Sequence, residues 1–194
     1  MAKLIFVVGV AGTGKSTVAR ALTKQFPSIY LDRDTAAGRY TDLFLAHNGL
    51  DPDDRDSAFF LTHCRDVEYD LTMDVALENL DLGKDVILIS PFTKELKDAN
   101  WITQQLQRIG LTLNDVSVKV IVVYLSDMNV QRERIIGRAT ERDRWKLDNW
   151  DEYAKRLKDP EINWPIPATS ILKFDNLLEL SEKKVKELVE FVEK

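Results

Sequence analysis

The chain has 194 residues, with 27 Lys and Arg against 32 Asp and Glu and a formal net charge of −5. Hydrophobic residues make up 44% and charged residues 30%, which is ordinary for a globular protein of one domain with a substantial core. The acidic balance disfavours general nucleic-acid binding, which needs a basic face. The single cysteine, Cys64, excludes an internal disulfide and a cysteine-based zinc site.

No stretch of the sequence is apolar for long enough to span a bilayer. The apolar run that starts at Leu4 stops at Gly9, which is too short for a signal peptide. We therefore expect a cytoplasmic protein without a membrane partner, built as a single domain over residues 1–194. The sequence leaves open whether it is a monomer or a homodimer.

Apolar runs alternate with amphipathic stretches along the chain. The runs are rich in Val and Ile, as expected of parallel strands covered on both faces. The expected strands are Leu4–Val8, Ser28–Leu31, Val86–Ile89, Val118–Leu125 and Ser170–Phe174. The expected helices are Thr17–Phe26, Ser57–Leu80, Lys94–Ile109 with Thr93 as its cap, and one after Ser181, while 32–56 is expected to be an acidic loop. This alternation predicts an α/β fold with a five-stranded parallel sheet and helices on both faces.

The most specific motif is Gly9-Val10-Ala11-Gly12-Thr13-Gly14-Lys15-Ser16, which fits G-x-x-x-x-G-K-[ST] between an apolar strand and an amphipathic helix. Its glycines let the backbone curl until successive N–H groups point at a polyphosphate, and the helix adds the positive end of its dipole. Lys15 would reach the β- and γ-phosphates, and Ser16 would ligate Mg²⁺. We predict a three-layer P-loop NTPase fold that binds ATP through Gly9, Ala11, Gly12, Thr13, Gly14, Lys15, Ser16 and Thr17.

Two carboxylates follow the second expected strand, at Asp32 and Asp34. In parallel sheets ligands bind at the carboxyl ends of strands, so one carboxylate could hold Mg²⁺ and the other could accept a proton from a substrate hydroxyl. The alternative is an Asp N-cap in a solvated turn. The spacing alone does not decide between them.

Residues 132–146 carry six basic and three acidic side chains and form a positive segment on an acidic protein. Arg134, Arg138 and Arg142 are four residues apart and would share one face of a helix. This pattern fits a lid, over about residues 127–147, that closes on phosphates. The alternative is a solvated helix surface.

Together these parts resemble the small P-loop kinases of the nucleoside-monophosphate-kinase-like group, especially the shikimate and gluconate kinases. Polynucleotide 5′-hydroxyl kinases and toxin or antibiotic kinases are related and of similar size. The resemblance implies that Asp32 serves the magnesium and Asp34 the substrate, that Arg65 matches the substrate-binding Arg of an Arg-x-x-Glu motif, and that Arg138 or Arg142 contacts phosphates. It also places adenine near residues 165–168, before the last expected strand, and near Asp175 and Asn176 after it.

The chain departs from this group in one respect that bears on magnesium. The strand Val86–Ile89 is followed by Ser90 rather than by the Asp of an ordinary ATPase, so that Mg²⁺ would depend on Ser16 and Asp32. The glycine cluster that shikimate kinases carry after this strand is absent, which disfavours shikimate itself.

The sequence therefore predicts an ATP- and Mg²⁺-dependent phosphotransferase that phosphorylates a hydroxyl of a small molecule. Lys15, Asp34, Arg138 and Arg142 would be catalytic, Arg134 and Arg138 would bind the nucleotide, and Asp34 and Arg65 would bind the acceptor. A nucleotide or polynucleotide-end kinase is an alternative that the acidic segment 32–56 disfavours. A nucleotide-dependent switch is a second one, which the missing Asp after the third strand disfavours. Neither the acceptor nor the choice between ATP and GTP follows from the sequence.

Overall fold

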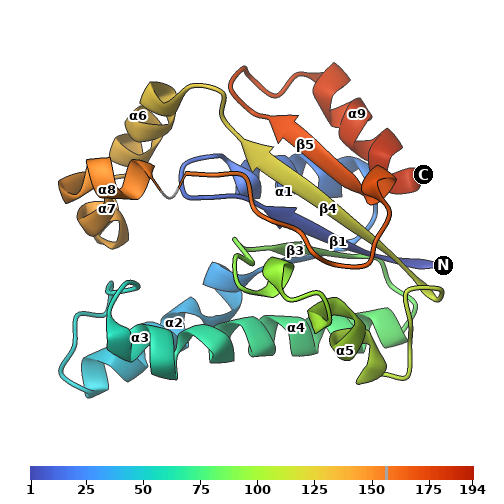
Figure 1. The fold of residues 1–194 in the computed structure, drawn as a ribbon, viewed down its shortest axis with the longest axis horizontal. Helices are drawn as coiled ribbons and strands as arrows, with labels where there is room; N and C mark the ends of the chain where they lie inside the picture. Colours follow the sequence, from blue (N-terminus) through green and yellow to red (C-terminus); the bar gives the residue numbers. More distant parts are fainter. Residues whose placement is uncertain (156) are drawn as a thin grey trace.

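The computed structural model describes residues 1–155 and 157–194, and its centre is a parallel sheet (Figure 1). The strands are β1 (Ala2–Val8), β2 (Ile29–Asp32), β3 (Val86–Ile89), β4 (Val116–Tyr124) and β5 (Ile171–Asp175). Their order in the sheet is β2-β3-β1-β4-β5. All neighbouring pairs are parallel, with Ile89 opposite both Val7 and Asp32. The carboxyl ends of the strands therefore lie along one edge.

Helices form a layer on each face of this sheet (Figure 1). One layer consists of α1 (Lys15–Gln25) and α9 (Glu182–Glu193). The other contains α4 (Arg65–Asp81), α5 (Trp101–Gln107) and the short η1 (Glu95–Lys97), with α2 (Arg33–His47) and α3 (Ala58–His63) packed beside α4. At the carboxyl edge lies the lid segment, which we define as α6 (Met128–Arg138), η2 (Glu141–Asp143), α7 (Arg144–Asp148) and α8 (Trp150–Ala154); η3 (Ala168–Ser170) precedes β5. The predicted three-layer α/β fold is confirmed.

The central strand β1 shows why the apolar runs are continuous. Leu4, Phe6 and Val8 pack into the core under α4 and α5, whereas Ile5 and Val7 pack under α1 and α9, and all five are fully buried. Because successive side chains of a strand point to opposite faces, a strand covered on both faces needs apolar residues at every position. In the described part of the chain, no helix is long and apolar enough to cross a bilayer.

The segment expected to be an acidic loop is instead largely helical, and that prediction is wrong. α2 begins at Arg33, directly after β2, with Asp32 as its cap: the Asp32 carboxylate accepts a hydrogen bond from the Asp34 N–H at 3.1 Å. The buried residues of α2 are mostly small or polar, namely Ala37, Gly38, Thr41 and Leu45. A helix with so weak an apolar stripe gives little periodic signal in the sequence.

The long helix expected over Ser57–Leu80 is divided at Cys64 into α3 and α4. Its apolar spacing predicts one buried stripe made of Phe60, Cys64, Val67, Leu71 and Val75, and that prediction is partly wrong. Val67, Leu71 and Val75 are exposed by 54%, 37% and 36%. The buried face of α4 instead mixes apolar and polar residues, including Tyr69, Glu68, Met73 and Thr72. The buried stripe is still mostly apolar, but Glu68, whose carboxylate belongs to the cleft described below, interrupts its pattern in the sequence.

The helix expected over Lys94–Ile109 is present only in part. η1 ends at Lys97, Asp98 is extended, and α5 then runs from Trp101 to Gln107. Thr93 does not cap either element, because the residues at their amino ends are Lys94 and Asn100. The last helix begins after Ser181 as predicted, and the Ser181 hydroxyl accepts a hydrogen bond from the Lys184 N–H.

Phe6 is expected to be a main source of stability. Its ring lies at the centre of an aromatic cluster, with ring centroids 5.0 Å from Phe92 and 4.8 Å from Trp164. Replacing it in Phe6→Ala removes these contacts and leaves a cavity, which should lower the free energy of unfolding by about 3–5 kcal/mol in denaturant titrations. The control Leu82→Ala, at a position 72% exposed, should change it by less than about 0.5 kcal/mol. Equal effects of the two changes would contradict this description of the core.

Candidate active site

The loop between β1 and α1, residues 9–16, is a tight curl that only glycine allows at several positions. Gly9, Gly12 and Gly14 have φ angles of +144°, +83° and +86°, a region that side chains disfavour. A Cβ on Gly9 would lie 2.2 Å from the Val123 carbonyl oxygen, and one on Gly14 would lie 2.4 Å from Nδ2 of Asn176. We call this segment the phosphate loop, because its backbone turns around the amino end of α1.

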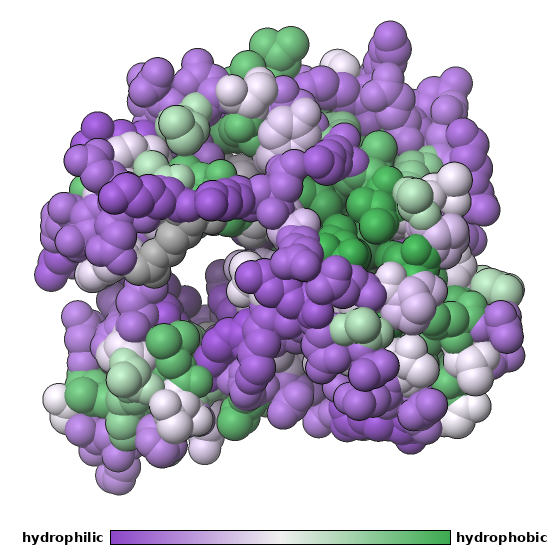
Figure 2. All heavy atoms as spheres, viewed as in Figure 1, coloured by the Kyte–Doolittle hydropathy of each residue, from purple (hydrophilic) through white to green (hydrophobic). Residues whose placement is uncertain are grey.

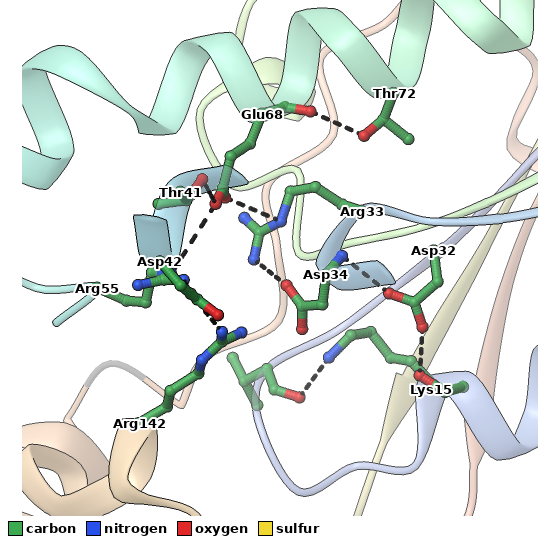
Figure 3. Close-up of polar contacts among 12 residues, drawn as sticks. Lys15, Asp32, Arg33, Asp34, Thr41, Asp42, Arg55, Glu68, Thr72 and Arg142 are labelled. Carbon is green, nitrogen blue, oxygen red and sulfur yellow. Dashed lines mark hydrogen bonds and ion pairs between the residues drawn. The ribbon is translucent and has the colours of Figure 1, made fainter. Parts of the chain in front are cut away.

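Lys15 lies inside this curl. Its ammonium donates a hydrogen bond to the Val10 carbonyl oxygen at 3.0 Å (Figure 3). Burial lowers the pKa of Lys15 to about 8, with Asp34 acting against that shift and Arg138 and Arg33 adding to it. The shift also shows that Asp34 and Arg138, which are far apart in the sequence, lie close enough to Lys15 for their charges to act on it.

Ser16 and Asp32 meet at the carboxyl end of β2. The Ser16 hydroxyl donates to Oδ2 of Asp32 at 3.0 Å, and the Tyr30 hydroxyl donates to the same oxygen at 3.3 Å. Asp32 therefore caps α2 with one carboxylate oxygen and accepts the Ser16 hydrogen bond with the other, so that the cap is observed and the magnesium role stays a prediction. A hydroxyl beside a carboxylate is the oxygen donor set that Mg²⁺ prefers, and these two residues fit a magnesium site.

Asp34 is on the first turn of α2 and faces the phosphate loop (Figure 3). Arg33 donates to its Oδ1 at 2.7 Å. Burial would raise the pKa of Asp34, but the charges of Arg33, Lys15 and Arg142 outweigh it and hold the pKa below its ordinary value. The group is therefore a carboxylate at neutral pH, surrounded by three cations.

Glu68 of α4 is the buried carboxylate on the other side of Arg33, and it is 3% exposed. It accepts a hydrogen bond from the Thr41 hydroxyl at 2.7 Å. Its carboxylate oxygens also pair with Arg33 at 3.5 Å and with Arg55 at 3.9 Å. Arg33 Nε and Glu68 Oε2 have no hydrogen-bond partner among the described side chains. This Arg–Glu network forms the wall of the cleft opposite the phosphate loop (Figure 3).

The lid segment reaches across the cleft through Arg142. Its guanidinium donates to Asp42 of α2 at 2.7 Å (Figure 3). It also donates to Asp53 at 3.2 Å. Arg55 contacts the same Asp42 oxygen. The space-filling view shows an opening between the lid segment and α2–α3 with a mostly hydrophilic rim (Figure 2). The cleft is thus lined by paired charges rather than by apolar side chains.

The three lid arginines do not share one helix face, which corrects the sequence prediction. α6 ends at Arg138 because Ala139 takes a left-handed conformation, with φ +47°, and Arg142 follows in η2. Arg138 pairs with Asp143 at 2.6 Å. Arg134 donates to the carbonyl oxygens of Asn176 and Leu177 at 3.0 and 3.1 Å. Each arginine therefore has a different set of partners.

Arg65, the first residue of α4, pairs with a carboxylate outside the phosphate loop. It makes two hydrogen bonds to the Glu95 carboxylate, at 2.8 and 3.1 Å. Its guanidinium lies 4.3 Å from the ring centroid of Tyr69, and that of Arg33 lies 4.9 Å from it. Arg65 is thereby connected to the cleft wall through Tyr69, and its contact with an acceptor stays a prediction.

The structure brings Lys15, Asp34, Arg138 and Arg142 around one cleft, with Ser16 and Asp32 beside them. Thr17 is on the first turn of α1 and exposed. Sequence reasoning missed Asp42 and Arg55 as members of the site, because the segment that carries them was expected to be a loop. Glu68 had a signal, the Arg-x-x-Glu spacing that starts at Arg65.

The fold and the phosphate loop together define a P-loop protein, and the resemblance to the small P-loop kinases is confirmed at the level of the fold. A sequence profile of the AAA domain family matches residues 4–160, and the chain belongs to that family. No curated protein matches the chain.

Several solved structures share the fold over almost the whole chain. A candidate kinase from Chloroflexus aurantiacus is 18% identical with a TM-score of 0.66, over 99% of this chain and 97% of that chain. A sugar kinase from Janibacter is 14% identical with a TM-score of 0.59, over 100% of this chain and 95% of that chain. The APS kinase of Mycobacterium tuberculosis, solved with AMPPNP and APS, is 16% identical with a TM-score of 0.56. The match covers 100% of this chain and 98% of that chain. At such identities the likeness establishes the fold alone.

The lowered pKa of Lys15 predicts a pH-dependent stability difference. Below about pH 8 the folded protein carries a buried ammonium at a desolvation cost, and this cost disappears as the pH approaches 10.5, the value of an unperturbed lysine. The uncharged variant Lys15→Met should therefore melt at a higher temperature than the unmodified protein at about pH 7, by a margin that shrinks toward about pH 10. Thermal melts between about pH 7 and 10 measure this difference in melting temperature. A difference that stays constant or grows with pH would contradict the lowered pKa of Lys15.

Proposed function

We propose that the protein transfers the γ-phosphoryl group of ATP to a hydroxyl of a small-molecule acceptor. The observation that carries the proposal is the position of Asp34. Its carboxylate lies within the electrostatic reach of Lys15 in the phosphate loop and also contacts Arg33, which belongs to the polar wall of the cleft. A carboxylate between a phosphate site and a polar cleft is suited to an acceptor hydroxyl.

The phosphate loop is proposed to hold the triphosphate through its main-chain N–H groups and the ammonium of Lys15. On binding, Lys15 would exchange the Val10 carbonyl for a phosphate oxygen, and the anionic ligand would restore its charge above pH 8. Mg²⁺, held by Ser16 and Asp32, would neutralise phosphate charge during the transfer. These residues position and stabilise, and they form no covalent intermediate.

Asp34 is proposed to orient the acceptor hydroxyl. Because its pKa is below the ordinary value, it remains charged at neutral pH and accepts a hydrogen bond from the hydroxyl in the ground state. In a loose phosphoryl-transfer transition state the hydroxyl proton is released late, so that a weak base in the right place is sufficient.

Arg138 and Arg142 are proposed to stabilise the charge that shifts from the γ-phosphoryl group to the leaving oxygen. Arg138 lies near Lys15, and Arg142 already bridges the lid segment to α2. When the lid segment closes over the nucleotide, these side chains would also exclude water, which protects the phosphoryl group from hydrolysis.

The acceptor is proposed to be a polar small molecule. The acidic residues of 32–56 that line the cleft are neutralised by arginines, as in the Asp42 contacts with Arg55 and Arg142. The cleft is therefore less negative than the acidic segment 32–56 suggested. Its side chains can make hydrogen bonds to the hydroxyl groups of an acceptor. A cytoplasmic location and an assembly no larger than a homodimer remain part of the proposal.

A transfer assay tests the proposed function. The purified protein is incubated with γ-labelled ATP, Mg²⁺ and separate pools of sugars, nucleosides, amino alcohols and oligonucleotides, with Lys15→Ala as the control. We expect label in one small-molecule pool, and a loss of at least about a hundredfold in the variant. Label in oligonucleotides would support an end kinase instead. ATP binding without transfer to any pool or stimulated hydrolysis would support a nucleotide-dependent switch.

Removing the charge of Asp34 should affect transfer more than nucleotide binding. In Asp34→Asn we expect kcat to fall by about 10²–10⁴, because the amide cannot accept the hydroxyl proton, while the Kd for ATP changes less than about threefold. Asp81→Asn, at the far end of α4 and exposed, is the matched control and should behave like the unmodified protein. Unchanged kcat in Asp34→Asn would remove this residue from the mechanism.

A further inference from the structure

Two buried side-chain amides hold the outer side of the phosphate loop. Nε2 of Gln131, on α6, donates to the Ala11 carbonyl oxygen at 2.7 Å. Nδ2 of Asn176, directly after β5, donates to the Thr13 carbonyl oxygen at 2.9 Å. Gln131 is 3% and Asn176 6% exposed. The resemblance to small kinases had placed adenine near Asn176, whereas its side chain here binds the phosphate loop.

These contacts fix the direction of two peptide planes. In a trans peptide the C=O and the following N–H point in opposite directions, and no cis peptide occurs in the described residues. When Gln131 draws the Ala11 carbonyl outward, the N–H of Gly12 turns to the inside of the curl. Asn176 does the same for the Thr13 carbonyl and the N–H of Gly14. Both N–H groups belong to the concave side where a phosphate would bind.

The packing around the loop shows that these two amides are closely fitted. A Cβ on Gly12 would lie 3.2 Å from Cγ of Gln131, and the Cβ of Gly14 would collide with Nδ2 of Asn176. Asn176 is itself held, because Arg134 donates to its carbonyl oxygen at 3.0 Å. α6 and the segment after β5 flank the loop from the lid side of the molecule (Figure 1).

We propose that Gln131 and Asn176 are positioning residues that preset the Gly12 and Gly14 N–H groups for a triphosphate. This inference rests on the proposed function, in that it assumes a polyphosphate in the loop. It gives a role in phosphate binding to α6 and to the segment between β5 and α9, which both lie outside the motif of residues 9–16. Arg134 supports Asn176 through its carbonyl oxygen.

Binding of inorganic tripolyphosphate and of MgATP by calorimetry tests the inference, well below the melting temperature of each protein. Gln131→Met and Asn176→Leu keep the side-chain size but lose the donor, and each should weaken both ligands by the same factor, about tenfold. The KM for ATP should rise correspondingly, with kcat at saturating ATP changed less than about twofold. Gln107→Met, exposed on α5, is the control and should bind as the unmodified protein does.

A merely structural role would lower the melting temperature and leave the affinity of the folded protein unchanged, and that result overturns the inference. If the unmodified protein binds both ligands, and the two variants bind them as tightly as the unmodified protein does, only the inference fails. If the unmodified protein binds neither ligand, the proposed function fails and the inference with it.

A second measurement does not depend on the variants. In the unmodified protein without ligand, the side-chain amide protons of Gln131 and Asn176 should exchange slowly with water, observed by NMR. Fast exchange of both before tripolyphosphate is added would mean that the loop is not preset, and would overturn the inference.

Discussion

The tight curl of residues 9–16 is the constraint on which the rest of the site depends. At Gly9 and Gly14 the backbone passes so close to Val123 and Asn176 that no side chain fits. The curl aims the amino end of α1, with its unpaired N–H groups and positive dipole end, at the carboxyl edge of the sheet. The same curl buries Lys15 and lowers its pKa, which makes a negative ligand the natural partner of this ammonium.

A second theme is the pairing of charges across the cleft. Arg33, Arg55 and Arg142 are each matched by carboxylates of α2, α4 or the segment between α2 and α3. Exposed ion pairs contribute little to stability, but partly buried ones fix the directions of side chains. The Arg142 contact with Asp42 joins the lid segment to α2 through an ion pair. The proposed closure of the lid segment over a nucleotide would use this ion pair as a contact that can break and re-form.

Much of the fold could be predicted from the sequence, because buried parallel strands and the phosphate loop have strong local signals. The strands β1 and β3 and the start of α9 follow directly from apolar runs and from the Ser181 cap. α2 was missed because its buried face is made of small and polar residues such as Ala37 and Thr41. Glu68 likewise interrupts the apolar pattern of the buried face of α4, because its carboxylate pairs with Arg33 and Arg55 of the cleft.

The site was only partly predictable, for a related physical reason. Lys15, Ser16, Asp32 and Asp34 are local to two strand ends, and the rule that ligands bind at such ends was sufficient to group them. The partners of Arg142 lie about a hundred residues away in the sequence, and no local pattern indicates them. The contact between Asn176 and the phosphate loop is also of this kind, since it depends on the order of the strands.

The central claim is that the phosphate loop encloses the phosphates of a nucleoside triphosphate in main-chain N–H groups. A crystal structure with a non-hydrolysable ATP analogue and Mg²⁺ tests it most directly. We predict phosphate oxygens within hydrogen-bond distance of the N–H groups of Gly12, Gly14 and Lys15, with the Lys15 ammonium moved from Val10 to a phosphate. An analogue bound elsewhere, or a loop that excludes it at saturating concentration, would contradict the account.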